Sequence, residues 1–262
     1  MNRFRHNERL ASSSTFRVAV IVLVAVSLPL FFISWNVRVL TNSQTFYEWG
    51  FDNYNVERRT GLEGTELNSA AAQIIDYFNN DEELLDVRVN FQGTEFELFN
   101  QREIIHMRDV KELMNAVFLV GWVTSVLLVV LIVTGFFTVG RRFLPLLRSG
   151  IIWSTIGGLV IAAFVGLASL IDFNTTFRIF HEISFRNDFW MLSPSQSMLL
   201  RMFPQGFWLI ATMILVVVSA IELGVVYGGA TWGLRRFGRS GTRGRTHPAP
   251  ALDSDAVVEP TI

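Results

Sequence analysis

The sequence predicts an all-α membrane protein: a bundle of four transmembrane helices with a small extracytoplasmic cap of helices and one β-hairpin, and with both chain ends in the cytoplasm. Two observations carry this prediction. Half of the 262 residues are hydrophobic, and they gather in four long blocks rather than in short periodic segments. Arginine is concentrated in the segments on one side of these blocks. The chain contains no cysteine, which excludes a disulfide scaffold and a thiolate nucleophile.

The four apolar blocks have the length that a bilayer requires. Each holds about 21–23 residues, and at roughly 1.5 Å per residue this gives about 32–35 Å, enough to cross the hydrocarbon core. We place the spans at residues 18–39, 117–139, 151–171 and 207–227. Two of these spans contain no charged residue, and each of the other two contains one.

The net charge of −1 hides an asymmetry between the two sides of the blocks. The segment before the first span, the turn at 140–150 and the segment after the fourth span together carry twelve arginines. The two remaining segments, 41–114 and 172–206, carry eighteen acidic and ten basic residues when Arg38 is counted with them. Short basic segments beside spans face the cytoplasm, so these two acidic segments are expected outside. The basic residues lack interleaved aromatics, and nucleic-acid binding is not indicated.

The ends of the chain are expected to be cytoplasmic. Residues 1–17 form a short N-terminus, residues 18–240 the membrane domain, and residues 241–262 a disordered tail rich in Pro, Ala and acidic residues. The first span could pass for a signal peptide, but no small-residue cleavage site follows it, so an uncleaved anchor is favoured. Pro29 is expected to kink this span.

The outer cap at 41–114 is expected to have secondary structure of its own. Aromatic residues cluster just after the first span, where an interfacial belt is favoured over a lipid-binding wall. From Thr65, apolar residues recur with helical periodicity as far as Phe78, and residues 87–100 alternate around Gln92-Gly93, which predicts a hairpin. Aromatic residues of the belt are Phe46, Tyr47, Trp49, Phe51 and Tyr54.

Two histidines are placed at the outer surface. One helix is predicted over 101–139, and its polar start carries His106, with Glu103 and Asp109 three residues to either side on the same face. His181 lies in the second outer segment, among aromatic residues that suit an interfacial or re-entrant element. A short helix is expected at Met198–Met202. Imidazole titrates near pH 6.5, so two of them on one surface favour proton-transfer chemistry over two structural histidines.

Several enzyme signatures are absent. The chain has no G-x-S-x-G motif, no phosphate loop and no H-E-x-x-H motif, since Phe185 stands where the second histidine would be. The two histidines with Asp109 and Asp188 could ligate zinc, but their spacing is not diagnostic and no metal is predicted. Glu222, in the fourth span, is expected to snorkel or to form an interhelical pair rather than to relay protons.

The same residues carry a resemblance to a known family. Two motifs, Glu103-x-x-His106-Met107-x-Asp109-Val110-Lys111 and Phe180-His181-x-x-Ser184-Phe185-x-Asn187-Asp188-x-Trp190, are similar to those of the four-span bacterial family that includes the lipoprotein intramolecular transacylase. The resemblance covers roughly residues 30–235. It extends to Tyr47, Tyr54-Asn55-Val56, Thr60-Gly61, Ile74 to Asn79 and Met202-Phe203-Pro204.

This resemblance implies an acyltransferase of the cell membrane that needs no cofactor. Its reaction moves the sn-2 acyl chain of a diacylglyceryl lipoprotein onto the α-amine of the N-terminal cysteine and leaves a lyso-form lipoprotein. The implied partners are a diacylated lipoprotein or phospholipid-like substrate in the outer leaflet, and membrane lipid.

The resemblance also implies roles for individual residues. His106 would be the general base, oriented by Asp109 or Glu103, while His181 would stabilise the oxyanion or protonate the leaving glycerol oxygen. An acyl-imidazole intermediate is a less favoured route. Asn187 or Asp188 would lie near the headgroup. The residues expected to bind substrate are Tyr47, Phe180, Phe185, Phe189 and Trp190.

Two other classes of function stay open. The first is a non-catalytic membrane sensor or assembly protein whose outer cap binds lipid or protein. The second is a metal-dependent lipid hydrolase. The acyl-transfer hypothesis differs from both in requiring that the imidazoles of His106 and His181 share one chamber.

Overall fold

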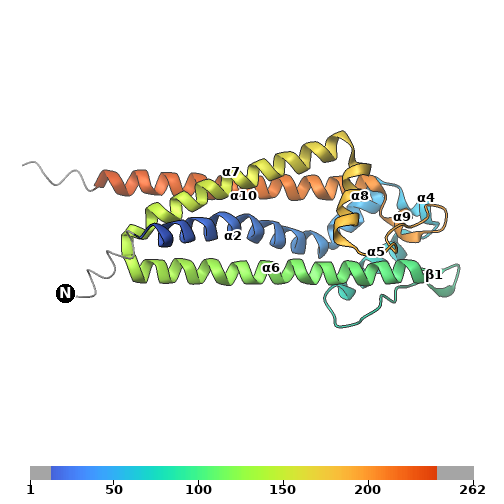
Figure 1. Ribbon diagram of the computed structural model, residues 1–262. Helices are drawn as coiled ribbons and strands as arrows, with labels where there is room; N and C mark the ends of the chain where they lie inside the picture. Colours follow the sequence, from blue (N-terminus) through green and yellow to red (C-terminus); the bar gives the residue numbers. More distant parts are fainter. Residues whose placement is uncertain (1–12, 241–262) are drawn as a thin grey trace, which may run out of the picture.

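Four long helices lie alongside one another in the protein, with a smaller group of elements at one end (Figure 1). The computed structural model describes residues 13–240, and side chains as far as residue 233. The expectations for residues 1–12 and 241–262 therefore lie outside the described residues. The long helices are α2 (Ser14–Thr41), α6 (Gln101–Val139), α7 (Phe143–Ile171) and α10 (Gln205–Ser240).

Three helical stretches of the described chain are long and apolar enough to cross a membrane. They are Ser14–Thr41, Gln101–Ile171 and Gln205–Gly233. The middle stretch, of 71 residues, contains both α6 and α7. The 3₁₀ turn Gly140–Arg142 joins them, and after it the chain runs back along the bundle as α7 (Figure 1).

The turn between α6 and α7 is shorter than the predicted segment at 140–150. Helix α7 already begins at Phe143, whose ring is fully buried with Val20 and Leu146. A Cβ atom on Gly135 would lie 2.4 Å from this ring, so a glycine is needed where α6 passes it. Packing of Phe143 thus extends α7 by two turns beyond the apolar block that the sequence predicted.

One uninterrupted helix from residue 101 to residue 139 was predicted, and α6 confirms it. Its start is a capping box: the Asn100 side chain accepts from the backbone N–H groups of Arg102 and Glu103, and the Glu103 carboxylate accepts from Asn100 N. The polar first turns of α6 therefore project into the cap, while the apolar remainder belongs to the bundle.

The interhelical pair favoured for Glu222 is present. Asn36 Nδ2 of α2 donates to Glu222 Oε2 of α10 at 2.7 Å and lies 3.0 Å from Ser219 Oγ. A polar group between helices in an apolar bundle is stabilised when a neighbour satisfies it. Pro29 lies inside α2, which continues as a helix on both sides of it.

The cap contains the predicted helix and the predicted hairpin. Helix α5 (Gly64–Tyr77) is followed by β1 (Arg88–Phe91) and β2 (Thr94–Glu97), which pair antiparallel. Gln92 and Gly93 both have positive φ, as a two-residue hairpin turn requires. Two further helices, α3 (Gln44–Asn53) and α4 (Val56–Thr60), precede α5.

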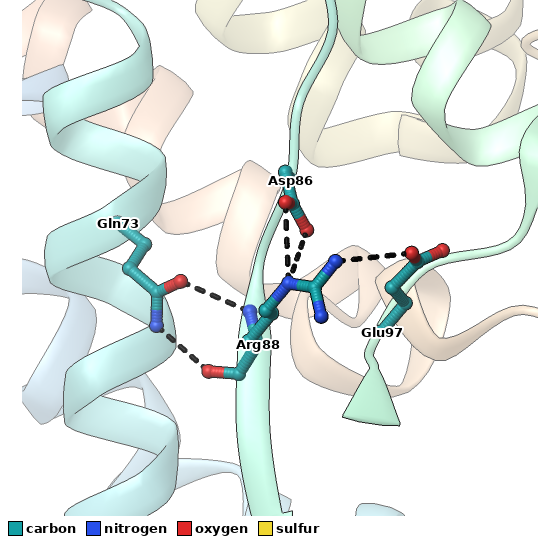
Figure 2. A network of polar contacts seen from close by, with 4 residues as sticks. All are labelled: Gln73, Asp86, Arg88 and Glu97. Atoms are coloured by element: carbon teal, nitrogen blue, oxygen red, sulfur yellow. Dashed lines mark hydrogen bonds and ion pairs between the residues drawn. The ribbon is translucent and has the colours of Figure 1, made fainter. Parts of the chain in front are cut away.

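The side chain of Gln73 on α5 covers part of the outer edge of β1 (Figure 2). Gln73 donates to the Arg88 carbonyl at 2.9 Å and accepts from Arg88 N at 3.0 Å, so it pairs with β1 as a further strand would. The Arg88 guanidinium binds Asp86 and Glu97. Because backbone groups at a sheet edge invite pairing with other chains, this contact both fixes the hairpin and closes that edge.

The aromatic cluster after the first span forms part of the core of the cap. Tyr47 and Phe51 are buried: both pack against Phe203, just before α10, and Tyr47 also packs against Phe207 in its first turn. The interfacial-belt interpretation is therefore wrong for these two residues, because α3 folds back onto α10. Trp49 remains exposed.

Residues 172–206 contain two short helices. Helix α8 (Phe173–Ser184) crosses the cap end of the bundle (Figure 1), and Asp172 caps its start by accepting from Thr175 N at 3.1 Å. The predicted helix at Met198–Met202 is α9. Helix α8 buries His181 and exposes Ile183, so this amphipathic helix presents an apolar side chain to its surroundings.

Candidate active site

The imidazole rings of His106 and His181 face one another at the cap end of the bundle. Their centroids are 5.9 Å apart and their planes are inclined by 33°. Each residue is only 7% exposed. The two histidines are far apart in sequence, so their proximity depends on α8 folding across the start of α6.

Both histidines line one largely apolar cavity of about 180 Å³. Helices α2, α3, α5, α6, α8, α9 and α10 all contribute to its wall. An apolar chamber with a few converging polar groups is typical of a ligand site. Six of the residues predicted for the site line it: Tyr47, His106, Phe180, His181, Phe185 and Trp190.

A hydrogen bond fixes the tautomer of His181 and therefore which ring nitrogen is free to accept a proton. Its Nδ1 lies 2.7 Å from the carbonyl oxygen of Phe177, one helical turn earlier. A carbonyl oxygen can only accept, so Nδ1 carries the proton and, in the neutral ring, Nε2 is an acceptor. Burial lowers the pKa of His181, while the bond to Phe177 acts in the opposite direction.

His106 has no comparable partner. Its Nδ1 is buried without a hydrogen bond, and Phe185 meets its ring edge-to-face at 5.3 Å. Burial, and secondarily the charge of His181, lowers the pKa of His106 to about 4, although Asp109 raises it. At neutral pH the ring is therefore uncharged and its tautomer is not fixed by a neighbour.

Glu103 does not orient His106, as the resemblance had implied it could. Its buried carboxylate accepts from Ser197 Oγ at 2.6 Å, from Leu199 N at 2.7 Å and from Asn100 N at 2.9 Å. Three hydrogen-bond donors satisfy the Glu103 carboxylate, and none of them belongs to His106. Glu103 instead attaches α9, and with it part of the cavity wall, to the first turn of α6.

Asp109 connects α6 to the segment that follows α8. Its Oδ2 accepts from Asn187 Nδ2 at 2.8 Å, and its Oδ1 lies 3.4 Å from Arg108. Asn187 also accepts from Phe189 N, which fixes the local turn. Asp109 therefore acts on His106 through its charge and through the position of this segment, rather than through a hydrogen bond.

Asp188 and Phe189 lie on the outer side of the same segment. The Asp188 side chain is exposed, and its backbone carbonyl accepts a hydrogen bond from Arg102. The Arg102 guanidinium lies 5.6 Å from the Phe189 ring centroid. These two residues therefore hold the segment against α6 but do not form the cavity wall.

Tyr47 of α3 also lines the cavity. Its hydroxyl donates to the Thr41 carbonyl at 3.2 Å, at the end of α2. Burial raises the pKa of this hydroxyl. Tyr47 is thus a fixed, neutral wall residue at neutral pH.

The sequence interpretation missed other residues of the site. Phe177, whose ring centroid is 4.2 Å from that of His181, lines the cavity and supplies the carbonyl that sets the tautomer. Its position four residues before His181 in a helix is a signal that could have revealed it. Trp208 and Ser197 contribute through folding between distant segments, which no local pattern indicates.

The described residues contain no group of three or more His, Asp or Glu side chains arranged to hold a metal ion. The four residues considered for zinc are not gathered: Asp109 binds Asn187 and the Asp188 side chain is exposed.

Comparison with known protein families shows one match over most of the chain. Residues 22–208 match the family model described as lipoprotein intramolecular transacylase Lit. An uncharacterised protein of Aquifex aeolicus is 25% identical over 206 residues, which cover 78% of this chain and 89% of that protein.

Solved structures of the membrane-integral lipoprotein intramolecular transacylase Lit from Bacillus cereus share the fold. One aligns with a TM-score of 0.70 at 16% identity and covers 86% of this chain and all of that one. A structure of a single-residue variant of the same protein aligns with a TM-score of 0.65 at 17% identity, covering 87% and 98% of the two chains.

Proposed function

The chain belongs to the lipoprotein intramolecular transacylase family, and from this premise we propose that it moves the sn-2 acyl chain of a diacylglyceryl lipoprotein onto the α-amine of the N-terminal cysteine. The product is a lyso-form lipoprotein. The observation that carries the proposal is the pair of buried imidazoles, 5.9 Å apart, in a cavity otherwise lined by apolar side chains.

We also propose the placement of the protein in the cell membrane. Helices α2, α6, α7 and α10 each cross the bilayer once, with both chain ends in the cytoplasm and the cap outside. In the sequence, twelve arginines flank the four apolar blocks in the segments that do not belong to the cap, and this asymmetry supports the orientation. The cavity then lies at the outer leaflet, where a diacylated lipoprotein is anchored.

Proximity supplies a large part of the catalysis. The attacking amine and the ester belong to one substrate molecule, so no second reactant has to be captured. Well-oriented intramolecular reactions of this kind reach effective molarities of about 10⁵–10⁸ M. What remains for the protein is to remove a proton from the amine, stabilise the tetrahedral oxyanion and protonate the leaving glycerol oxygen.

The hydrogen bonding of the two rings supports a division of these tasks. Neutral His181 carries its proton on Nδ1, bound to Phe177, so Nε2 is the acceptor that takes the amine proton and later returns it to the glycerol oxygen. His106 is neutral and has no bond that fixes its tautomer, so its ring N–H donates to the oxyanion. This assignment moves the general-base role from His106 to His181 and the oxyanion role to His106, and it keeps protonation of the glycerol oxygen with His181.

The apolar wall accounts for the lipid part of the substrate. Phe185 and Trp190 border the histidines, and Phe180 lines the cavity while remaining 48% exposed. Phe180 therefore marks a place where the cavity reaches the molecular surface, and through which an acyl chain enters. Burying methylene groups contributes about 0.8 kcal/mol each.

The experiment that tests the proposal is an acyl-position assay. Purified protein is incubated with a diacylated lipopeptide, and the products are fragmented in a mass spectrometer. Transacylation leaves the intact mass unchanged, so the result expected is a new fragment with the acyl chain on the α-nitrogen. His106→Ala and His181→Ala should lose this fragment, whereas Glu182→Ala, which alters the exposed neighbour of His181, should retain it.

The same assay separates the other two functions. An unchanged fragmentation pattern with wild-type protein would contradict the transacylase and leave the non-catalytic membrane module. Release of free fatty acid that a chelator suppresses would indicate the metal-dependent hydrolase instead.

A further inference from the structure

Arg38 occupies an unusual position at the cap-side end of α2. Its guanidinium carbon lies 4.7 Å from the ring centroid of Phe118 on α6 and 5.9 Å from that of Trp35, one turn earlier on α2. A cation within about 6 Å of an aromatic ring centroid is attracted to the ring face, so the two rings together hold the guanidinium in place. The side chain is therefore ordered before any anion binds.

This guanidinium has no acceptor among the described side chains and backbone. The other partly or fully buried cations of the described residues each bind an oxygen: Arg108 binds Asp109, Lys111 binds Asn80 and Glu82, and Arg201 binds Ser195. None of the buried nitrogens that lack a hydrogen bond belongs to Arg38. Its guanidinium nitrogens are therefore accessible from the surface. A partly buried charge that lacks a partner is costly unless an external anion or water supplies one.

Specific contacts between α2 and α6 hold the residues around Arg38 in place. Trp35 Nε1 donates to Ser125 Oγ at 3.0 Å, which fixes the indole against α6. Trp122 stacks edge-on against Trp35 at 5.2 Å and is 55% exposed. Gly121 lets the two helices approach, since a Cβ there would lie 3.1 Å from Ser34 Cβ. Exposed tryptophans with an arginine at the end of an apolar span are typical of the lipid headgroup level.

We propose that Arg38, on its platform of Trp35 and Phe118, binds the phosphate of a membrane phospholipid in the cap-side leaflet. The planar guanidinium matches two phosphate oxygens, and the exposed ring of Trp122 lies against the glycerol and upper acyl chains. Phe118 lies twelve residues after His106, about 18 Å along α6 at 1.5 Å per residue. The phosphate site is therefore separate from the imidazole pair.

The proposed ligand differs from the proposed substrate in one group. A diacylglyceryl cysteine carries the same acyl chains but no phosphate, so it cannot replace the phospholipid at Arg38. The site holds a lipid of the surrounding bilayer and anchors the cap-side end of α2 to the part of α6 around Phe118. It does not depend on the acyl-transfer proposal.

Native mass spectrometry of the full chain tests this site. Detergent-solubilised protein is titrated with dioleoyl phosphatidylglycerol or with dioleoylglycerol, which lacks the phosphate. We expect a tightly bound phosphatidylglycerol on the wild type and at least about tenfold weaker binding on Arg38→Gln, the loss that one charge-assisted contact produces. Arg38→Lys keeps the charge but not the planar fork, so its affinity should lie between the two. Arg58→Gln removes an exposed charge from α4 and should bind like the wild type.

Three results would overturn the proposal. The first is equal phosphatidylglycerol binding by wild type and Arg38→Gln. The second is equal binding of the two lipids by the wild type, a comparison that needs no variant and so stands even if Arg38→Gln fails to fold. The third is displacement of the bound lipid by millimolar inorganic phosphate, which would identify a site for a free anion.

Discussion

The side-chain amide of Asn187 donates a hydrogen bond of 2.8 Å to the Asp109 carboxylate, and this bond holds the segment after α8 against α6. Asp109 lies one turn from His106. Asn187 lies two residues from Phe185, whose ring contacts both imidazoles. The position of the aromatic wall beside the reacting groups therefore depends on a polar contact outside the cavity.

The substitution Asn187→Leu should loosen this wall. A hydrogen bond to a charged group contributes about 1.5–3 kcal/mol, and a partly exposed bond lies at the lower end of that range. We expect faster amide hydrogen exchange in residues 185–190 and a transacylation rate about tenfold lower. Ser195→Ala, which alters an exposed hydroxyl of the same segment, is the control. Unchanged exchange in Asn187→Leu would show that the bond does not position the segment.

Replacement of either imidazole should remove most of the activity. Proton transfer by a positioned side chain contributes about 10²–10⁴-fold, so His106→Gln and His181→Gln should each reduce the rate at least about 100-fold. Because the two rings act on one tetrahedral intermediate, the double variant should be little slower than either single variant. A strictly multiplicative loss, measured by the acyl-position assay, would indicate independent roles.

The lowered pKa of His106, about 4, makes a prediction about stability. Unfolded histidine binds its proton near pH 6.5, so between pH 6.5 and about 4 the unfolded chain holds a proton that the folded protein does not. Folding stability should therefore decrease as the pH falls through this window. The thermal midpoint of wild-type protein should decrease more over that range than the midpoint of His106→Gln. Equal decreases would contradict the lowered pKa.

Much of the fold could be predicted from local sequence patterns. The continuity of α6 follows from the absence of breaking residues, and the hairpin follows from alternation around Gln92-Gly93, because helix and turn formation depend on residues close in sequence. The role of Glu103 could not be predicted. Its spacing from His106 indicated an imidazole partner, but its donors, Ser197 and Leu199, lie 94 and 96 residues further along the chain.

The substrate-binding residues show the same limit. Six of the proposed site residues line the cavity, and five of them do so because the two histidine motifs bring their aromatic neighbours with them. Tyr47 lines it for a different reason: α3 folds back onto the start of α10 and places this ring beside Phe203. That contact depends on tertiary packing, and composition alone favoured an interfacial position for Tyr47.

The buried carboxylate of Glu103 should be important for stability. In Glu103→Gln the amide oxygen can still accept from Ser197 and Leu199, but the NH₂ group then faces the N–H of Asn100, which loses its acceptor. Because this N–H group is only partly buried, the loss of its acceptor costs toward the lower end of about 1–3 kcal/mol. We expect a lower thermal midpoint, whereas Glu112→Gln, at an exposed position of α6, should leave it unchanged. A midpoint equal to that of the wild type would mean that this network does not attach α9.

The size of the cavity should limit the acyl chain that it accepts, and Ala211 offers a way to test this. Ala211 is a buried small residue of α10 that lines the cavity beside much larger aromatic side chains. Ala211→Phe would fill part of a space of about 180 Å³, and overpacking of an enclosed site typically costs about 1–3 kcal/mol. The variant should transacylate lipopeptides with long acyl chains more slowly than the wild type does, and its rate with short-chain lipopeptides should be almost unchanged. Ala163→Phe adds the same ring at an exposed position of α7 and should alter neither rate. An equal loss for both chain lengths would mean that Ala211→Phe disturbs the histidine pair rather than the acyl site.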